Sequence, residues 1–214
     1  MTFIPNQALL KINQELLSLS VSFPNVHGKI ECFHISKNSH QKYNIPNSYQ
    51  PMSILSTSPV ISAFDQSTCL HATPQHYASL MSAFSTAFPD FDFSTVAPWN
   101  FKLVNSPEQA QNNINWNFRT ALSDCDQLTS HLWSVLEKEI SPASCYIYTY
   151  ESDRPDAFTE MGTVFNLCYF FLNEKMSKIV LVHLREGAHE FGSGSDDDAD
   201  SFNDEMDGDQ YGYL

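Results

Sequence analysis

Residues 162–185 read GTVFNLCYFFLNEKMSKIVLVHLR, and this stretch decides the fold. Residues 163–172 and 178–184 are rich in β-branched and aromatic side chains, and a short polar break at residues 173–175 separates them. Two such runs around a short polar break are typical of a β-hairpin. Residues 168–172 are continuously apolar, which predicts that the first strand is covered on both faces. We therefore expect this hairpin at the centre of a sheet.

The segments that precede the hairpin predict two further strands and several helices. Leucine and isoleucine spacing favours a helix over residues 9–19, and residues 28–35 favour a strand. Residues 77–88 again follow helical spacing and stop at Pro89. Residues 128–140 favour another helix, and residues 145–150 a strand.

The sequence Ser106-Pro107 is a strong start for one more helix, because serine caps helices and proline suits their first turn. Its expected buried stripe is Ala110, Ile114, Phe118 and Ala121. Together these elements predict an α+β fold, with a mainly antiparallel β-sheet covered by helices in a sandwich-like arrangement.

Two segments differ in composition from this periodic body. Residues 37–68 are rich in Ser, Asn, Gln and Pro, and residues 187–214 in Gly, Ser, Asp and Glu. Neither offers enough apolar surface to offset the entropy cost of ordering. We expect a single globular domain over residues 1–186 with a mobile insert at 37–68, followed by a disordered acidic tail at 187–214.

Composition excludes several classes of function. Only Gly28 and Gly162 precede the tail, so the body lacks the clustered glycines of a phosphate-binding loop or a dinucleotide fingerprint. The net charge of −14 disfavours direct nucleic-acid binding. The five cysteines are odd in number and form no C-x-x-C pair, which favours reduced thiols in cytosol or nucleus. The sequence shows no signal peptide and no stretch long enough to span a membrane, so we expect a soluble intracellular protein.

Candidate catalytic groups are weak. Asp90 and Asp92 have the spacing of an acid–base pair on a strand, but a turn or capping pair is the favoured interpretation. The histidines, including His183 and His189, match no ligand spacing for a metal. Cys168 lies in the apolar run, where the pKa of a thiol is raised. We predict no catalytic residue, no metal and no cofactor.

The tail is the stronger functional signal. Ten of the 25 acids follow Arg185, the last lysine or arginine of the chain, and nine of these lie in the tail, where they alternate with aromatic residues. An acidic run is often only a solubilising device, and an interaction tail for a basic partner is the alternative. The acids of the candidate tail site are Asp196, Asp197, Asp198, Asp200, Asp204, Glu205, Asp207 and Asp209.

Several blocks in a fixed order resemble the Maf-one family, the global repressors of RNA polymerase III transcription. Residues 162–185 follow a signature block of that family without a gap. Residues 28–35, 88–95 and 145–150 are similar to its Gly-basic-Ile-Glu strand, its Phe-x-Pro-Asp element and its Cys-x-Ile-Tyr-x-Tyr strand. The family's basic turn is diluted here at residues 174–178, and the insert lacks its basic cluster.

The resemblance implies a non-enzymatic negative regulator of RNA polymerase III. It implies binding to the polymerase clamp and initiation-specific subunits, which blocks docking of the Brf–TATA-binding-protein initiation factor. It also implies control by kinases and phosphatases within the insert, where Ser58-Pro59 is a proline-directed step, and a nuclear and cytoplasmic distribution. We expect a monomer without membrane association. The candidate phosphorylation sites are Ser53, Ser56 and Ser58.

Two other classes stay open on the residues alone. An acidic chaperone or adaptor for basic proteins such as histones would use the tail as its main element. A cysteine-dependent enzyme would need one thiol of lowered pKa.

Overall fold

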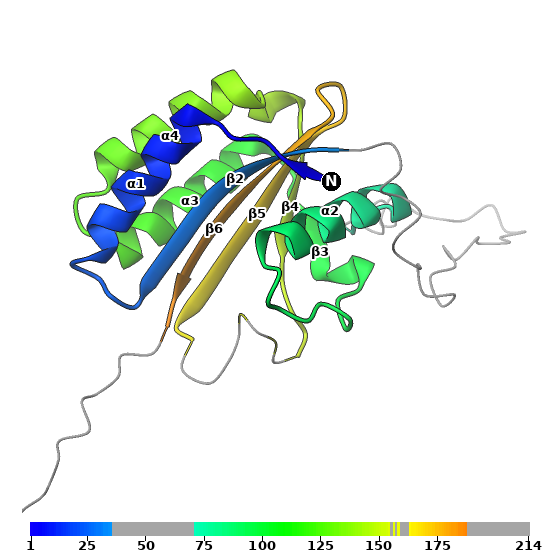
Figure 1. Ribbon diagram of the computed structural model, residues 1–214, viewed down its shortest axis with the longest axis horizontal. Helices are drawn as coiled ribbons and strands as arrows, with labels where there is room; N and C mark the ends of the chain where they lie inside the picture. The colour runs from blue at the N-terminus through cyan, green and yellow to red at the C-terminus, as the bar shows by residue number, and fades with distance from the viewer. Residues whose placement is uncertain (36–70, 155, 157, 159–162, 188–214) are drawn as a thin grey trace, which may run out of the picture.

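A six-stranded antiparallel sheet organises the computed structural model, which describes residues 1–35, 71–154, 156, 158 and 163–187 (Figure 1). The strand order is β1-β2-β6-β5-β4-β3. The strands are β1 (Thr2–Phe3), β2 (Val26–His34), β3 (Phe101–Leu103), β4 (Tyr146–Tyr150), β5 (Phe165–Asn173) and β6 (Lys178–Glu186). The helices are α1 (Gln7–Ser20), α2 (Pro74–Ala87), α3 (Pro107–Ala121) and α4 (Asp126–Glu139). Among the described residues, this arrangement confirms the predicted α+β fold.

The predicted hairpin is the centre of the sheet. β5 and β6 pair along their full length, from Phe165 opposite Glu186 to Asn173 opposite Lys178. Ser177 closes the turn in the left-handed region, with φ 49°. All seven residues from Leu167 to Asn173 are buried, because both faces of β5 are covered as expected.

The first strand joins the hairpin across the long connection, also as expected. β2 pairs with β6 from Val26 opposite Glu186 to His34 opposite Lys178. α1 begins at the N-cap Asn6, whose Oδ1 accepts hydrogen bonds from the backbone N–H groups of Ala8 and Leu9. It then returns beside the exposed edge of β2.

The side chain of Asn13 from α1 closes part of that edge. Its Nδ2 donates to the carbonyl oxygen of Ile30 at 2.8 Å, and its Oδ1 accepts from the Ile30 N–H at 2.8 Å. The amide thus replaces a neighbouring strand at Ile30. Unpaired groups on an edge strand are otherwise open to pairing with another chain.

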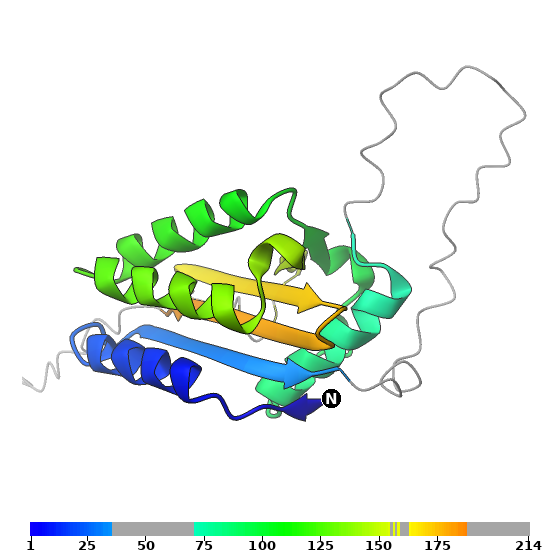
Figure 2. The ribbon, with the colours of Figure 1, turned by 90° about the horizontal axis from the view of Figure 1, so that it is seen from above.

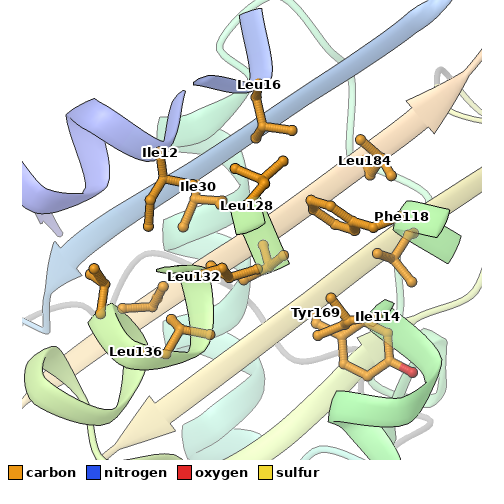
Figure 3. Close-up of a cluster of buried hydrophobic side chains, with 14 of the residues drawn as sticks. Ile12, Leu16, Ile30, Ile114, Phe118, Leu128, Leu132, Leu136, Tyr169 and Leu184 are labelled. Carbon is orange, nitrogen blue, oxygen red and sulfur yellow. The ribbon is translucent and has the colours of Figure 1, made fainter. Parts of the chain in front are cut away.

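Three helices cover one face of the sheet. α1, α3 and α4 pack against the even-numbered side chains of β2 and β6 and bury a mainly aliphatic core (Figure 3). The predicted stripe of α3, Ala110, Ile114, Phe118 and Ala121, is buried in this layer. Ser106 caps α3 as expected, because its Oγ accepts a hydrogen bond from the Gln109 N–H.

A single helix covers the opposite face, where the core is mainly aromatic. α2 lies on the other side of the sheet from α1, α3 and α4 (Figures 1 and 2). Phe84 of α2 is fully buried and stacks on Phe93 at 4.3 Å and on Phe158 at 5.2 Å between ring centroids. The residues between α2 and β3 therefore complete this layer together with Phe158.

The two outer strands were not expected from the sequence. β1 has two residues and β3 has three, so neither shows a periodic pattern. β3 pairs with β4 from Phe101 opposite Tyr150 to Leu103 opposite Tyr148. Both segments are strands because a longer neighbouring strand offers them hydrogen bonds.

Candidate partner-binding surface

The site residues predicted from the sequence lie outside the described residues. This holds for the three insert serines and for the eight acids of the tail. The structure instead places the residues at which these two segments join the body, and these residues are Ile35, His71 and Gly187.

The insert and the tail leave the sheet at opposite ends. Ile35 donates its backbone N–H to the Ser177 carbonyl at 2.8 Å, beside the β5–β6 turn. Gly187, which the sequence assigned to the tail, donates its N–H to the Asn25 carbonyl at 2.8 Å, past the far end of β6. Strands rise about 3.4 Å per residue, so nine-residue β6 separates the two exits by about 27 Å. The chain returns from the insert at His71, which bridges Lys102 on the β3 edge.

A histidine network fixes the insert end of the molecule. His76 in the first turn of α2 is buried, and its Nδ1 lies 2.7 Å from the Tyr148 hydroxyl. Its Nε2 lies 2.9 Å from Oε1 of Glu174 in the β5–β6 turn. The network therefore ties α2 to β4 and to the hairpin turn, where the insert leaves β2.

A second polar group lies near the tail end. Nε2 of His183 is 3.0 Å from Oδ1 of Asn166, and its ring packs on Phe88 and Phe158. Burial, and then the positive charge of Lys29 and other nearby cations, lowers the pKa of His183 to about 3. His183 is therefore a neutral core residue rather than a ligand for a partner.

Lys29 connects the end of α2 to the sheet. Its ammonium donates to the Ala87 carbonyl oxygen and lies 4.1 Å from the centroid of the Phe88 ring. A cation at the last carbonyls of a helix is stabilised by the helix dipole, and the aromatic face adds a cation–π contact. Lys29 also pairs with Glu31 at 3.5 Å, although burial still raises the pKa of that carboxyl.

The described thiols are not activated. Cys32, Cys125 and Cys168 are buried, and burial raises the pKa of each. Cys145 is half-buried, and burial raises its pKa to about 12. A nucleophilic cysteine needs a lowered pKa, so these four do not fit the cysteine-dependent alternative. Cys69 lies outside the described residues.

The carboxylate pair resolves as the turn that the sequence favoured. Oδ1 of Asp92 accepts the backbone N–H of Ser94 at 2.9 Å, and Oδ2 accepts its hydroxyl at 3.0 Å. These hydrogen bonds lower the pKa of Asp92. An Asx-turn with an ionised carboxylate is a local structural device.

The outer surface of α3 combines an exposed tryptophan with few charged residues. Trp116 is 71% exposed, and no charged residue lies between Glu108 and Arg119 on this helix. Its neighbours one turn away are Asn112, Asn113, Arg119 and Thr120, and Arg119 pairs with Asp126 at 3.0 Å. Tryptophan is enriched in the centres of protein interfaces, and charge is depleted there. Of the other two tryptophans, Trp133 packs on the core and Trp99 is 44% exposed.

The described part of the chain contains no group of three or more metal-ligating side chains. None of its helices is long and apolar enough to cross a membrane.

The sheet and its helices define a known type of α+β protein. Two crystal structures of citrus MAF1 share the fold, with TM-scores of 0.56 and 0.53 at 19% sequence identity. They cover 86% and 77% of this chain, which in turn covers 100% and 90% of theirs.

The family follows from the sequence itself. The model of the Maf1 regulator family matches residues 22–183, so this chain belongs to that family. The resemblance read from the sequence blocks is confirmed.

Two curated relatives carry names that describe a function. The Repressor of RNA polymerase III transcription from Dictyostelium discoideum is 36% identical over 107 residues, which are 50% of this chain and 38% of the relative. The Schizosaccharomyces pombe protein of the same name, maf1, is 25% identical over 132 residues, which are 56% of this chain and 52% of the relative. The chain therefore spans about half or less of the length of these relatives.

Proposed function

We propose that this chain is a negative regulator of RNA polymerase III transcription. The observation that carries the proposal is the family match over residues 22–183, which includes β2 to β5, the first six residues of β6, and helices α2, α3 and α4. The names of the two curated relatives support the same function. The buried cysteines of raised pKa favour a regulator over a cysteine-dependent enzyme.

The proposed mechanism is steric and electrostatic competition on the polymerase. The body would bind the clamp and initiation-specific subunits, and so block docking of the Brf–TATA-binding-protein factor. A nucleic-acid-binding cleft is basic because it holds phosphates, so the acidic tail would be attracted to it. Trp116, on the outer surface of α3, is well suited to the centre of such an interface.

Phosphorylation of the insert is the proposed control. Ser53, Ser56 and Ser58 lie in the segment that starts at Ile35, beside the His76 network. A phosphate adds about −1.5 to −2 charge, which would repel an acidic partner surface or reposition the insert. Kinases and phosphatases would then act as partners, and the chain would shuttle between nucleus and cytoplasm.

The direct test is transcription from a tRNA gene with purified polymerase III and its initiation factors. The chain should lower transcript yield when it is added before the Brf-containing factor, and much less when it is added afterwards. An equal effect in both orders would contradict competition for docking.

The same assay separates this function from that of an acidic chaperone. Histones added as competitors should relieve repression only at concentrations that neutralise the tail. A chain that binds histones tightly but leaves transcription unchanged would favour the chaperone.

A further inference from the structure

Two adjoining grooves lie along the N-terminal half of α1, one cationic and one apolar. The cationic groove has a volume of about 320 Å³ and lies between α1 and the C-terminal half of α4. The apolar groove has a volume of about 350 Å³ and lies between β1, α1 and the edge of β2. Both are lined by Gln7, so they meet at the first turn of α1.

The cationic groove carries two lysines with no acidic partner. Lys11 and Lys138 line it from opposite walls, and within the described residues neither makes an ion pair or a side-chain hydrogen bond. Of the nearby carboxylates, Glu139 lies 3.8 Å from Lys178, and Glu15 lies 3.0 Å from a ring nitrogen of His131. The lining of the groove itself holds two lysines against one carboxylate, a net charge of +1 in a chain of net charge −14.

The apolar groove exposes side chains that would normally be covered. Phe3 is 48% exposed and Leu10 is 56% exposed, and both line the groove with Leu9, Ile30 and Cys32. Glu31 is the only charged residue in its described lining, and it pairs with Lys29. A ligand for the two grooves together would combine carboxylates with aromatic or aliphatic side chains.

The C-terminal residues of this chain have that chemistry. Residues 188–214 contain nine acids and no lysine or arginine. Phe191, Phe202, Met206, Tyr211 and Tyr213 are interleaved with those acids. The tail therefore complements both the charge and the apolar character of the paired grooves.

The length of the chain permits the contact. The grooves lie toward the Lys178 end of β6, about 27 Å from its other end, where Gly187 begins the tail. An extended chain spans at most about 3.3–3.6 Å per residue, so Asp196 reaches about 30 Å from Gly187 and Asp209 reaches about 75 Å. The acids of the second half of the tail, from Asp204 onward, therefore have ample reach to Lys11 and Lys138.

We infer that the acidic–aromatic tail of this chain, residues 188–214, binds back onto the paired grooves of α1. Carboxylates of the tail pair with Lys11 and Lys138, and its aromatic side chains cover Phe3 and Leu10. In the free protein the tail then occupies its own body, and a basic partner must displace it. The contact concerns the isolated chain and goes beyond the proposed function, so its test needs no polymerase.

Zero-length carbodiimide cross-linking of the unphosphorylated full-length chain tests the contact. The reagent joins a lysine to a carboxylate only where the two touch, and mass spectrometry identifies the pair. Links from Lys11 and Lys138 to residues 196–209 should exceed links from Lys175 by about threefold or more, because tethering raises the effective concentration only where the geometry fits. An equal mixture of ¹⁴N and ¹⁵N protein should give links within one isotope.

A matched pair of leucines on one helix face tests the apolar part. Leu10→Ser removes a side chain from the groove, whereas Leu17→Ser removes one that is more exposed and lines neither groove. The first change should lower the links at Lys11 and Lys138 at least about twofold, and the second should leave them unchanged.

Several results would overturn the inference. Links spread evenly over all lysines, links concentrated on Lys37 or Lys42 of the insert, and an absence of links at Lys11 and Lys138 each exclude the α1 grooves as the site. Mixed-isotope links would assign the grooves to the tail of a second copy. Equal effects of the two leucine changes would mean that the apolar groove does not bind the tail, and that only unspecific charge attraction holds the tail to the body.

Discussion

The two faces of the central sheet are built from different side chains. The face under α1, α3 and α4 is filled mainly by leucine, isoleucine and valine, whereas the face under α2 is filled mainly by phenylalanine and tyrosine. Three helices supply the first layer, and one helix with its following loop supplies the second. Large rings help one helix and its following loop to cover this face of the sheet, because each aromatic side chain buries about 150–250 Å².

The difference has a consequence for the polar groups in each layer. On the aliphatic face, Asn13 places its amide at the edge of the sheet, where it completes the hydrogen bonds of Ile30. On the aromatic face, His183 and Lys29 lie between rings and the end of α2. The aliphatic layer is held together by many small side chains, whereas the aromatic layer is held together by large rings.

Neighbouring phenylalanines of β5 compare the two faces directly. Phe170 faces α2 and Phe171 faces α4, and both are fully buried. Replacing either with alanine should lower the free energy of unfolding by about 3–5 kcal/mol. Phe170 packs on Phe84 and Phe101 with centroid distances of 5.4 and 5.6 Å, so its loss should be the larger.

Leucine at the same positions sharpens the comparison. Phe170→Leu removes two aromatic pairs while keeping an apolar side chain, and should cost about 1 kcal/mol more than Phe171→Leu. Urea denaturation of the four variants measures these values. Equal losses at the two positions would mean that ring geometry adds nothing on the aromatic face.

The buried histidine makes the aromatic face sensitive to acid. His183 has an ordinary pKa near 6.5 when unfolded, and burial lowers its pKa to about 3 in the fold. Below pH 6.5 the unfolded chain therefore takes up a proton that the native state does not, and stability falls as the pH drops toward 3.

Between pH 7 and pH 5 this histidine should account for a loss of about 2 kcal/mol. His183→Gln should remove that part of the pH dependence, whatever it does to stability at pH 7. The measurement is urea denaturation from pH 5 to 7.5. An unchanged pH profile in the variant would assign the acid sensitivity to other groups.

The edge amide tests the aliphatic face. Asn13→Ala leaves the N–H and carbonyl of buried Ile30 without their side-chain partner, and should cost about 1–2 kcal/mol. Asn112→Ala, at an exposed position of α3, is the control and should change stability by less than about 0.5 kcal/mol. Thermal unfolding of both variants checks this, and similar melting temperatures would show that water replaces the Asn13 amide.

Strong periodicity explains what could be predicted from the sequence. The hairpin, the helices and the stripe of Ala110, Ile114, Phe118 and Ala121 follow patterns carried by many residues. The strands β1 and β3 are too short to carry such a pattern. Their pairing depends on neighbours that lie far away in the chain.

The surface features needed the structure for a similar reason. Lys11 in α1 and Lys138 in α4 lie far apart in the sequence, and no spacing rule predicts that they line the same groove. A polar residue such as Asn13 on a helix gives no sign that it meets a strand edge. The exposure of Trp116 is easier to predict from the sequence. A helix turns by about 200° over two residues, so Trp116 points away from the side on which Ile114 is buried. The insert serines and the tail acids stay predictions.

The smallest expected effect on stability concerns the outer surface of the aliphatic layer. Trp116 is 71% exposed, so Trp116→Ala should change the free energy of unfolding by less than about 0.5 kcal/mol. If α3 contacts the polymerase, the same change should weaken binding by at least about 1 kcal/mol, or about fivefold, because exposed tryptophans dominate interface energies. Trp116→Phe should recover part of the affinity, and Leu17→Ser, at an exposed position of α1 that lines neither groove, should leave it intact. Binding of each full-length variant to immobilised polymerase III measures the four affinities. An affinity unchanged by Trp116→Ala would exclude the outer face of α3 from the interface and leave the tail, the insert and the α1 grooves as its candidates.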